Sequence, residues 1–311
     1  MTTAPAHRRF MTRRQAVHVA LFDGLPLALL LAVVPLTWPW LRPGLYELGA
    51  SLVLWLVSCL GITVGYHRLF THRAFQCGRG VKLALGIAGS LAAAGPVIAW
   101  AATHRKHHQS SDAEGDPHSP NLAGSGWRGK WRGFLHAQFG WLVGHDLPSP
   151  LTHTRDLLAD PAALWVNGRY FAIVLGGIVA PALLVQLWEP GWRSFLTALV
   201  WAGFVRVMVV HQIISSVNSV CHLFGSRPYA TKEQSRNNAL LALPTVGESW
   251  HNNHHRHPSS AYIGLRWWQI DLGGWLVSAL KRTSLIWNVI DARGRKSETR
   301  SSKPEASGAE N

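Results

Sequence analysis

Residues 48–72 read LGASLVLWLVSCLGITVGYHRLFTH, and this stretch decides the fold. Its first 19 residues, 48–66, contain no Asp, Glu, Lys or Arg. A helix of about 20 apolar residues is long enough to cross the hydrocarbon core of a bilayer. The apolar segment ends directly at two histidines, His67 and His72. The sequence therefore predicts a membrane-spanning helix with potential metal ligands at one end.

Three further segments are long and apolar enough to span a bilayer, namely 22–40, 170–188 and 195–217. Short turns that contain Pro and Gly join the spans in pairs, at 42–44 and at 189–192. We therefore expect an all-α membrane protein in which four transmembrane helices form two hairpins.

Residues 81–102 form a fifth apolar stretch, which is rich in Ala and Gly. If this stretch crossed the membrane, the histidines before it and those after it would face opposite compartments. One metal site would then be unable to use both sets. We therefore predict interfacial or re-entrant helices here, broken near Gly95-Pro96.

The charge distribution predicts an orientation. Only 15% of the residues are charged, against about 25% in a soluble globular chain. Of the 30 Lys and Arg residues, only Arg42 and Arg193 fall between the two spans of a hairpin, Arg206 lies within a span, and the other 27 lie on the opposite side. Because Lys and Arg are enriched on the cytoplasmic side of membrane proteins, we expect both termini and all histidine clusters in the cytoplasm.

The spans divide the chain into a basic cytoplasmic tail (1–20), one domain (21–293) and a disordered tail (294–311) without apolar periodicity. Within the domain, 103–167 and 222–293 should form a cytoplasmic helical cap. The net charge of +14 has no nucleic-acid motif beside it, so an anionic membrane face or a phosphorylated substrate explains it better. The three cysteines form no CxxC pair, which argues against a thiolate metal site.

Three histidine clusters are the main functional signal: HRLFTH (67–72), HRKHH (104–108) and HNNHH (251–255). In the last two clusters the histidines are spaced i, i+3 and i+4, so they share one face of a helix. The i, i+5 pair in the first cluster lies about 140° apart on an ideal helix, so it needs a helix end or a distortion to converge.

The fourth span adds a polar stripe, formed by His211, Ser215, Asn218 and His222. A polar stripe within a span is costly unless it faces a functional interior. His222 at the cytoplasmic end would be a ninth metal ligand, and Asn218 one turn deeper would hold a metal-bound water. Nitrogen ligands without thiolates suit Zn, Fe, Cu or Ni, and nine of them suit two ions better than one.

Other histidines carry a weaker signal. We interpret four as ordinary surface or core residues: His7, His18, His153 and His257. Another four are undecided between that role and a place in the site: His118, His136, His145 and His211.

In this order the three histidine clusters resemble the histidine boxes of the membrane fatty acid desaturases. The narrower resemblance is to the stearoyl-CoA (acyl-CoA, delta-9) type. It rests on GYHRLFTHRAF (65–75), WAATHRKHH (100–108) with DPHSP (116–120), NSVCHLFG (218–225) and GESWHNNHH (247–255), while GLRWWQIDLGGW (264–275) is similar to the bacterial branch. The resemblance covers about residues 20–285.

The resemblance implies a bacterial inner-membrane enzyme with two iron ions. The iron ligands would be His67, His72, His104, His107, His108, His222, His251, His254 and His255, with Asn218 acting through a water. The implied reaction uses O2 to insert a cis double bond into a saturated acyl chain, at the 9–10 position of an acyl-CoA. The electrons would come from an external donor, which is a ferredoxin with its reductase, a flavin reductase or a b-type cytochrome.

Further residues are weaker candidates. The expected substrate contacts are Trp100, Arg105, Trp131, Arg132, Gln212 and Ser215, since Arg pairs well with phosphate. Helix–helix hydrogen bonding and attraction to the cytoplasmic leaflet are the alternatives for the polar members of this set. Glu248 is expected to orient an imidazole ring, and so are the carboxylates of the acidic loop, Asp112, Glu114 and Asp116. A solvated or ion-paired role, or partner binding by the loop, is the alternative.

Three competing functions remain open at this point. An acyl-lipid desaturase or a fatty acyl or alkane hydroxylase would use the same histidine boxes. A metal transporter would place its ligands near the middle of the membrane, whereas these histidines lie at the cytoplasmic ends of the spans. A peripheral lipid-binding protein would explain the positive charge and leave the histidines unexplained.

Overall fold

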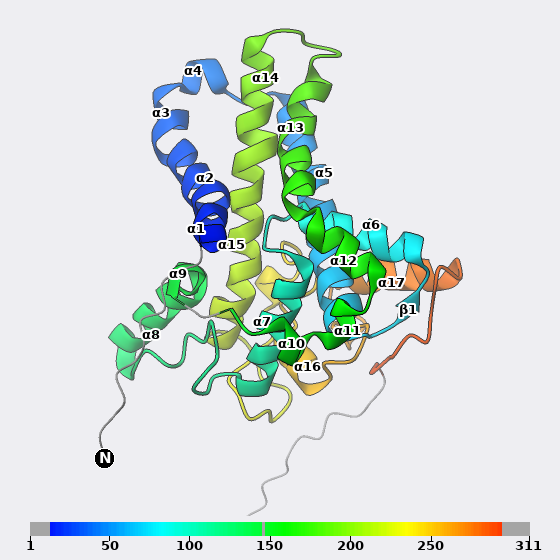
Figure 1. The fold of residues 1–311 in the computed structure, drawn as a ribbon. Helices are drawn as coiled ribbons and strands as arrows, with labels where there is room; N and C mark the ends of the chain where they lie inside the picture. Colours follow the sequence, from blue (N-terminus) through cyan, green and yellow to red (C-terminus); the bar gives the residue numbers. More distant parts are fainter. Residues whose placement is uncertain (1–12, 145–146, 294–311) are drawn as a thin grey trace, which may run out of the picture.

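The computed structural model describes residues 13–144 and 147–293. Apart from one sheet of two short strands, the described regular structure is helical, as the sequence predicts. Residues 1–12 of the predicted basic tail and the whole predicted tail 294–311 lie outside the described residues. Upright helices form the upper part of the molecule, and shorter helices gather beneath them (Figure 1).

The first hairpin contains two helices that are long and apolar enough to cross a membrane, Gln15–Leu36 and Leu45–Thr71. Helical structure already begins at Arg13, inside the predicted tail. The first helix consists of α1 (Arg13–Val19), η1 (Ala20–Gly24), α2 (Leu25–Ala28), η2 (Leu29–Val33) and α3 (Val34–Leu36), followed by the short α4 (Trp38–Leu41). The second consists of α5 (Leu45–Leu60) and the π-helical η3 (Gly61–Thr71).

The second hairpin contains the third long apolar helix, Trp192–His222. It is built from α14 (Trp192–Ala198), η5 (Leu199–Val205), α15 (Arg206–Ser219) and η6 (Val220–His222). Its partner is the pair α12 (Pro161–Gly168) and α13 (Tyr170–Val185), which bends by 58° between the two helices. The described part therefore has three candidate spans, or four if the bent pair counts as one.

The stretch predicted to be interfacial is broken where the sequence indicates. Helix α6 (Arg79–Ser90) ends before the break, and α7 (Val97–Ser110) begins directly after Pro96. Neither helix is long and apolar enough to be a candidate span. The buried Arg206 donates to the carbonyl oxygens of Leu91 in the break, at 2.6 Å, and Gly177 of α13, at 3.1 Å. An interfacial position of α6 and α7 stays a prediction.

The remaining elements lie below the long helices (Figure 1). They are α8 (Gly126–Leu135), η4 (His136–Gly140), α9 (Trp141–Gly144), α10 (Pro150–His153), α11 (Arg155–Leu158), η7 (Ala239–Leu241), α16 (His251–Arg256), α17 (Leu272–Arg282) and the antiparallel strands β1 (Gln76–Cys77) and β2 (Ile286–Trp287). A buried ion pair ties them to the spans, because Arg68 of η3 lies 2.8 Å from Asp271, the residue before α17. A cytoplasmic location of this part stays a prediction.

Candidate metal centre

A π-helical turn brings the first histidine pair together. The amide of His72 donates to the carbonyl oxygen of His67 at 3.0 Å, which is an i→i+5 hydrogen bond. The wider π turn rotates the fifth residue back toward the first, so the rings lie 4.8 Å apart between centroids. The distortion that an i, i+5 spacing requires is therefore present, and π turns are frequently found at functional sites.

Helix α7 supplies three rings from its last two turns. His104 and His108 lie one above the other, with their Nε2 atoms 2.9 Å apart. His107 lies between them in sequence, and its Nε2 atom lies 3.4 Å from that of His255. One helix therefore contributes ligands to two neighbouring groups of imidazoles.

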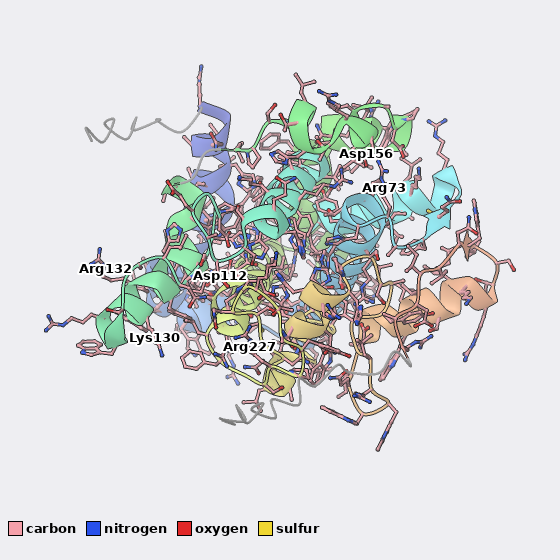
Figure 2. All side chains as sticks on the ribbon, turned by 90° about the horizontal axis from the view of Figure 1, so that it is seen from below. Arg73, Asp112, Lys130, Arg132, Asp156 and Arg227 are labelled. Atoms are coloured by element: carbon pink, nitrogen blue, oxygen red, sulfur yellow. The ribbon has the colours of Figure 1, made fainter. Side chains whose placement is uncertain are left out.

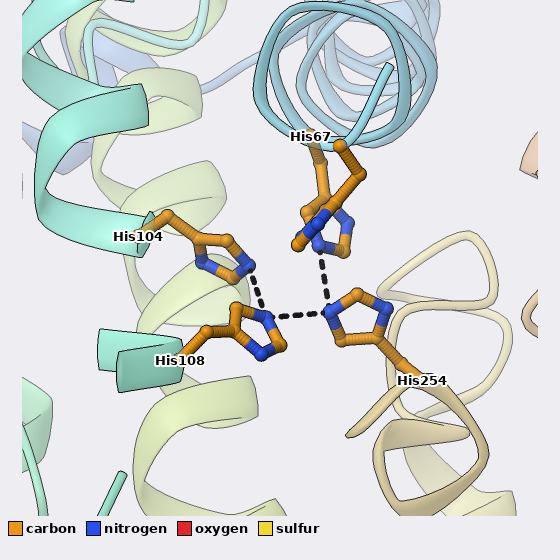
Figure 3. Close-up of side chains that lie close together, drawn as sticks. His67, His104, His108 and His254 are labelled. Atoms are coloured by element: carbon orange, nitrogen blue, oxygen red, sulfur yellow. Dashed lines mark hydrogen bonds between the residues drawn. The ribbon is translucent and has the colours of Figure 1, made fainter. Parts of the chain in front are cut away.

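Five histidines make up the first group, the five-histidine site: His67, His72, His104, His108 and His254. One ligand atom from each lies within 4.8 Å of all the others. Figure 3 shows four of these rings turned toward a common centre. The Nε2 atom of His254 lies 2.9 Å from that of His108 and 3.1 Å from that of His67.

The second group, the four-histidine site, consists of His107, His222, His251 and His255. The Nε2 atom of His251 lies 3.1 Å from that of His222 and 3.0 Å from that of His255. The rings of His222 and His107 are almost fully buried. The structure thus gathers all nine predicted ligands into two adjoining sites.

The nitrogen separations fit shared metal ions. Two imidazole nitrogens bound to one ion at about 2.1 Å lie about 3.0 to 3.4 Å apart when the angle between them is 90° to 109°. The observed separations of 2.9 to 3.4 Å match this range. In addition, the buried Nε2 atom of His72 has no hydrogen-bond partner within the described residues, which a metal ion would explain.

Carboxylates stand behind several rings and contact the Nδ1 atoms. Asp116 lies 3.0 Å from Nδ1 of His107, and Asp112 lies 2.8 Å from Nδ1 of His222. Glu248 lies 2.6 Å from Nδ1 of His67, and Glu233 lies 3.6 Å from Nδ1 of His255. A carboxylate hydrogen-bonded to Nδ1, as at His107 and His222, keeps the proton on that nitrogen and directs the lone pair of Nε2 toward a metal.

Burial keeps the ligand histidines outside the spans in their neutral form. It lowers the pKa well below the usual value for His72, His104, His108, His251, His254 and His255, and the neighbouring imidazoles add to the effect. Burial would raise the pKa of Asp116, but the hydrogen bond and the charge interaction with His107 outweigh it, so the pKa falls to about 2. The site therefore offers neutral nitrogens backed by ionised carboxylates, as metal binding requires.

A cavity of about 1160 Å³ adjoins both histidine sites. Five of the other predicted residues line it: Trp100, Gln212, Ser215, Asn218 and Glu248. The ring of Trp100 stacks on that of His104, 5.1 Å between centroids. The cavity also extends along α1 and η1, so it links the histidines to the interior of the long helices.

The remaining predicted substrate contacts lie elsewhere. The guanidinium of Arg105 pairs with Asp156 at 2.6 Å and also donates to the backbone carbonyls of Phe70, Thr71 and His153. Trp131 and Arg132 lie exposed on α8, and Figure 2 shows Arg132 and Lys130 pointing away from the body of the protein. A substrate-binding role for these residues stays a prediction.

Sequence reasoning left parts of the site open. Asp112 of the acidic loop stands behind the ring of His222. Glu233 stands behind the ring of His255, but it lies in a loop whose path the sequence does not predict. His118, which was undecided, lies beside the four-histidine site, with its ring 4.4 Å from that of His107 between centroids. Its place in DPHSP, two residues after Asp116, is the signal that would have found it.

The fold and the two sites together define a helical protein of membrane type with two adjoining groups of histidines that could hold metal ions. The sequence pattern of the fatty acid desaturases matches residues 45–281, and the chain belongs to this family. The predicted resemblance is confirmed at this level.

Curated relatives differ in the acyl carrier and the reaction that their names give. A hex-5-enoyl-[acyl-carrier protein] acetylenase of Moorena producens is 42% identical to this chain, and the match covers 88% of this chain and 86% of the relative. An sn-1 stearoyl-lipid 9-desaturase of Anabaena variabilis is 37% identical, over 88% and 93%. An icosanoyl-CoA 5-desaturase of Limnanthes douglasii is 34% identical, over 74% and 61%. The acyl-CoA specificity implied by the narrower resemblance therefore stays open.

Proposed function

We propose that this protein is an O2-dependent fatty acyl desaturase that inserts a cis double bond at the 9–10 position of a saturated acyl chain. The observation that carries the proposal is the pair of all-nitrogen sites at the wall of a large cavity. A methylene group in an alkyl chain has no acidic proton and no leaving group, so acid–base catalysis has nothing to act on. Two iron ions held by the nine histidines would supply the oxidising chemistry together with O2.

The residues of the chain would position the alkyl chain and keep the site dry. The cavity is lined mainly by apolar side chains, among them Ile62, Ala99 and Ile213, which suit an alkyl chain and exclude water. Trp100 and Thr103 lie where the cavity meets the five-histidine site, so they would hold two neighbouring methylenes beside it. Two hydrogens leave those carbons, and with O2, two electrons and two protons the products are a double bond and two waters.

For the carrier of the acyl chain we propose CoA first. The exposed face of α8 bears Arg128, Lys130 and Arg132 close to Trp131, and such residues suit the phosphates of a CoA thioester. Residues 139 and 141–143, which follow α8, line the cavity, so a head group bound at α8 would lie near one end of it. A glycerolipid carrier is the second candidate, since the Anabaena relative is named for a lipid substrate.

We also propose that the electrons come from a separate protein, either a ferredoxin with its reductase or a flavin reductase. The described residues contain no group of cysteines that would hold an iron–sulfur cluster. Reconstitution of the purified protein with each donor in turn, with unsaturated product as the readout, would identify the donor.

Expression in a desaturase-deficient host, followed by fatty acid analysis, tests the proposal. We expect the wild-type protein, with a matched electron donor, to produce monounsaturated chains and the His254→Ala variant to produce none. His257→Ala, at the end of the same helix, is the control and should retain activity. Oxygen retained in the product would show a hydroxylase instead. Purified protein supplied with stearoyl-CoA or with a stearoyl glycerolipid would distinguish the two carriers.

A further inference from the structure

A polar pair lies in the cavity wall, away from the two histidine sites. His211 of α15 and Asp23 of η1 both line the cavity, and Nδ1 of His211 lies 2.7 Å from Oδ1 of Asp23. We propose that this pair binds the carbonyl oxygen by which the acyl chain is joined to its carrier, and so sets which carbons reach the metal centre. The inference rests on the proposed function and names a positioning site for it.

The pair has an unused hydrogen-bonding group. His211 is only 7% exposed, and its Nε2 atom is buried without a hydrogen-bond partner within the described residues. Oδ2 of Asp23 is likewise without a partner. Ionisable side chains inside membrane-spanning helices are rare and mark functional positions. Burial of an unpaired polar atom costs about 1 to 3 kcal/mol, so a ligand that satisfies it is favoured.

Charge balance indicates the kind of ligand. A carboxylate that is largely shielded from water is stabilised by a positive partner, and the side chain of Asp23, which is 18% exposed, contacts His211. A protonated imidazole donates from both nitrogens. With Nδ1 donating to Asp23, an imidazole that also carries a proton on Nε2 would offer that proton to an oxygen from the cavity side. The carbonyl oxygen of an ester or thioester is such an acceptor.

A second donor lines the same cavity. Nε2 of Gln138 donates to Oε1 of Gln212 at 2.8 Å, and the hydroxyl of Ser219 donates to Oε1 of Gln138 at 2.6 Å. These bonds fix the side chain of Gln212 through its oxygen and leave its amide hydrogens without a partner among the described residues. Gln212 lines the cavity next to His211. The wall therefore presents two hydrogen-bond donors and suits a carbonyl group.

The spacing along α15 agrees with this role. His211 lies seven residues from Asn218, which is about 10 Å along the helix axis, and Asn218 is one turn from the ligand His222. An extended chain advances about 1.2 Å per bond, so 10 Å corresponds to about eight bonds. Eight bonds separate the carbonyl carbon from the ninth carbon of an acyl chain. A stearoyl chain bound in the opposite direction would place its methyl end at His211, at a similar distance from the reacting carbons. A methyl group accepts no hydrogen bond, so Nε2 of His211 would stay unsatisfied.

The test compares His211→Phe and Asp23→Asn with the control Thr197→Val, whose hydroxyl bonds to the carbonyl of Arg193 in the same long helix. Thr197 does not line the cavity. Iron content and melting temperature identify variants that fold. Binding of methyl stearate and of octadecane, which lacks the carbonyl, is measured on each iron-loaded protein. We expect the wild type and Thr197→Val to prefer the ester about tenfold and the two test variants to lose the preference, with a KM about tenfold higher and double bonds at more than one position.

Three outcomes would overturn the inference. The first is a folded His211→Phe variant with the same ester preference and the same double-bond position as the wild type. The second is a loss of binding affinity in the variants that is confined to stearate hydroxylated at its methyl end. This result would assign the pair to the methyl end of the acyl chain. The third is a loss of iron from the His211→Phe variant, which would make the residue part of the metal centre. If the wild type binds the ester selectively but forms no double bond, the proposed function fails and the binding site stands.

Discussion

At the scale of single residues, the orientation of the imidazole rings decides what the centre can bind. Histidine has two ring nitrogens, and only the one without a proton can ligate a metal. The carboxylates behind the rings make this choice, and all four lie outside the helices: Asp112 and Asp116 after α7, and Glu233 and Glu248 before α16. The loops would therefore take part in metal binding by orienting the imidazole rings.

Asp116→Asn tests this orienting role. The amide keeps the shape of the side chain but loses the charge that holds the proton on Nδ1 of His107. We expect iron affinity to fall about 10- to 100-fold, as for other residues that orient metal ligands. Iron titration of the purified variant measures the change. Glu114→Gln is the matched control, since Glu114 is exposed in the same loop, and equal affinities in both variants would contradict the role.

At the scale of elements, two close helix contacts hold the metal-binding segments in place. The first is where η3 crosses α6: a Cβ atom on Gly61 would lie 2.1 Å from the backbone nitrogen of Gly89. No side chain fits there, so the glycine lets the two backbones touch. The second is the buried guanidinium of Arg206, which joins the break before α7 to α13 and to its own helix.

Gly61→Ala should push η3 away from α6. Forcing an extra methyl group into a closed contact costs about 2 kcal/mol, and the shift would also move His67 and His72 out of the five-histidine site. We expect a lower melting temperature in detergent and a lower iron content. Gly49→Ala in α5 serves as the comparison, because a Cβ atom there meets no atom within 4 Å. If both variants behave alike, the contact is not as tight as described.

Arg206→Met should destabilise the protein without touching the histidines. It leaves the carbonyl oxygens of Leu91 and Gly177 unpaired in a buried place, and we expect a loss of about 3 kcal/mol. Thermal unfolding in detergent measures the loss. Arg193→Met removes hydrogen bonds of the same kind in an exposed hairpin and should have a much smaller effect. An unchanged melting temperature for Arg206→Met would show that these bonds add nothing to stability.

The helices could be predicted more fully than their contacts. Runs of apolar residues indicated the long helices at 48–66 and 195–217, and Gly95-Pro96 indicated the break between α6 and α7. The bend between α12 and α13 was not predicted, because Asn167 and Gly168 resemble any polar turn before a span.

At the scale of the whole molecule, the two histidine sites join segments that are distant in sequence. The five-histidine site takes ligands from η3, α7 and α16, and the four-histidine site takes them from α7, η6 and α16. Metal ions would therefore connect both hairpins to the helices below them. Spacing within each box indicated which histidines share a face, but the division into five and four depends on how the boxes pack together.

Removal of the metal should loosen this whole arrangement. A ligand at a hundredfold excess over its Kd stabilises the folded state by about 2.7 kcal/mol. We expect chelation to lower the melting temperature, and added Fe2+ to restore it. The same treatment of a His107→Ala, His254→Ala double variant, which lacks one ligand in each site, should have little effect. A wild-type protein that melts at the same temperature with and without chelator would contradict a metal-based connection.

The π turn at the end of η3 has one more consequence. Such a turn contains one residue more than an α-turn, so HRLFTH can be viewed as HxxxH with a residue inserted. In α7, His104 and His108 reach a common centre with ordinary helical spacing, whereas in η3 the inserted residue sets the two imidazoles at a different angle. A deletion of Leu69 or Phe70 would give the histidines of η3 the same i, i+4 spacing as His104 and His108. It would also shift every residue before the turn by one position relative to the residues after it. Evolution at this point is therefore constrained in length as well as in residue type.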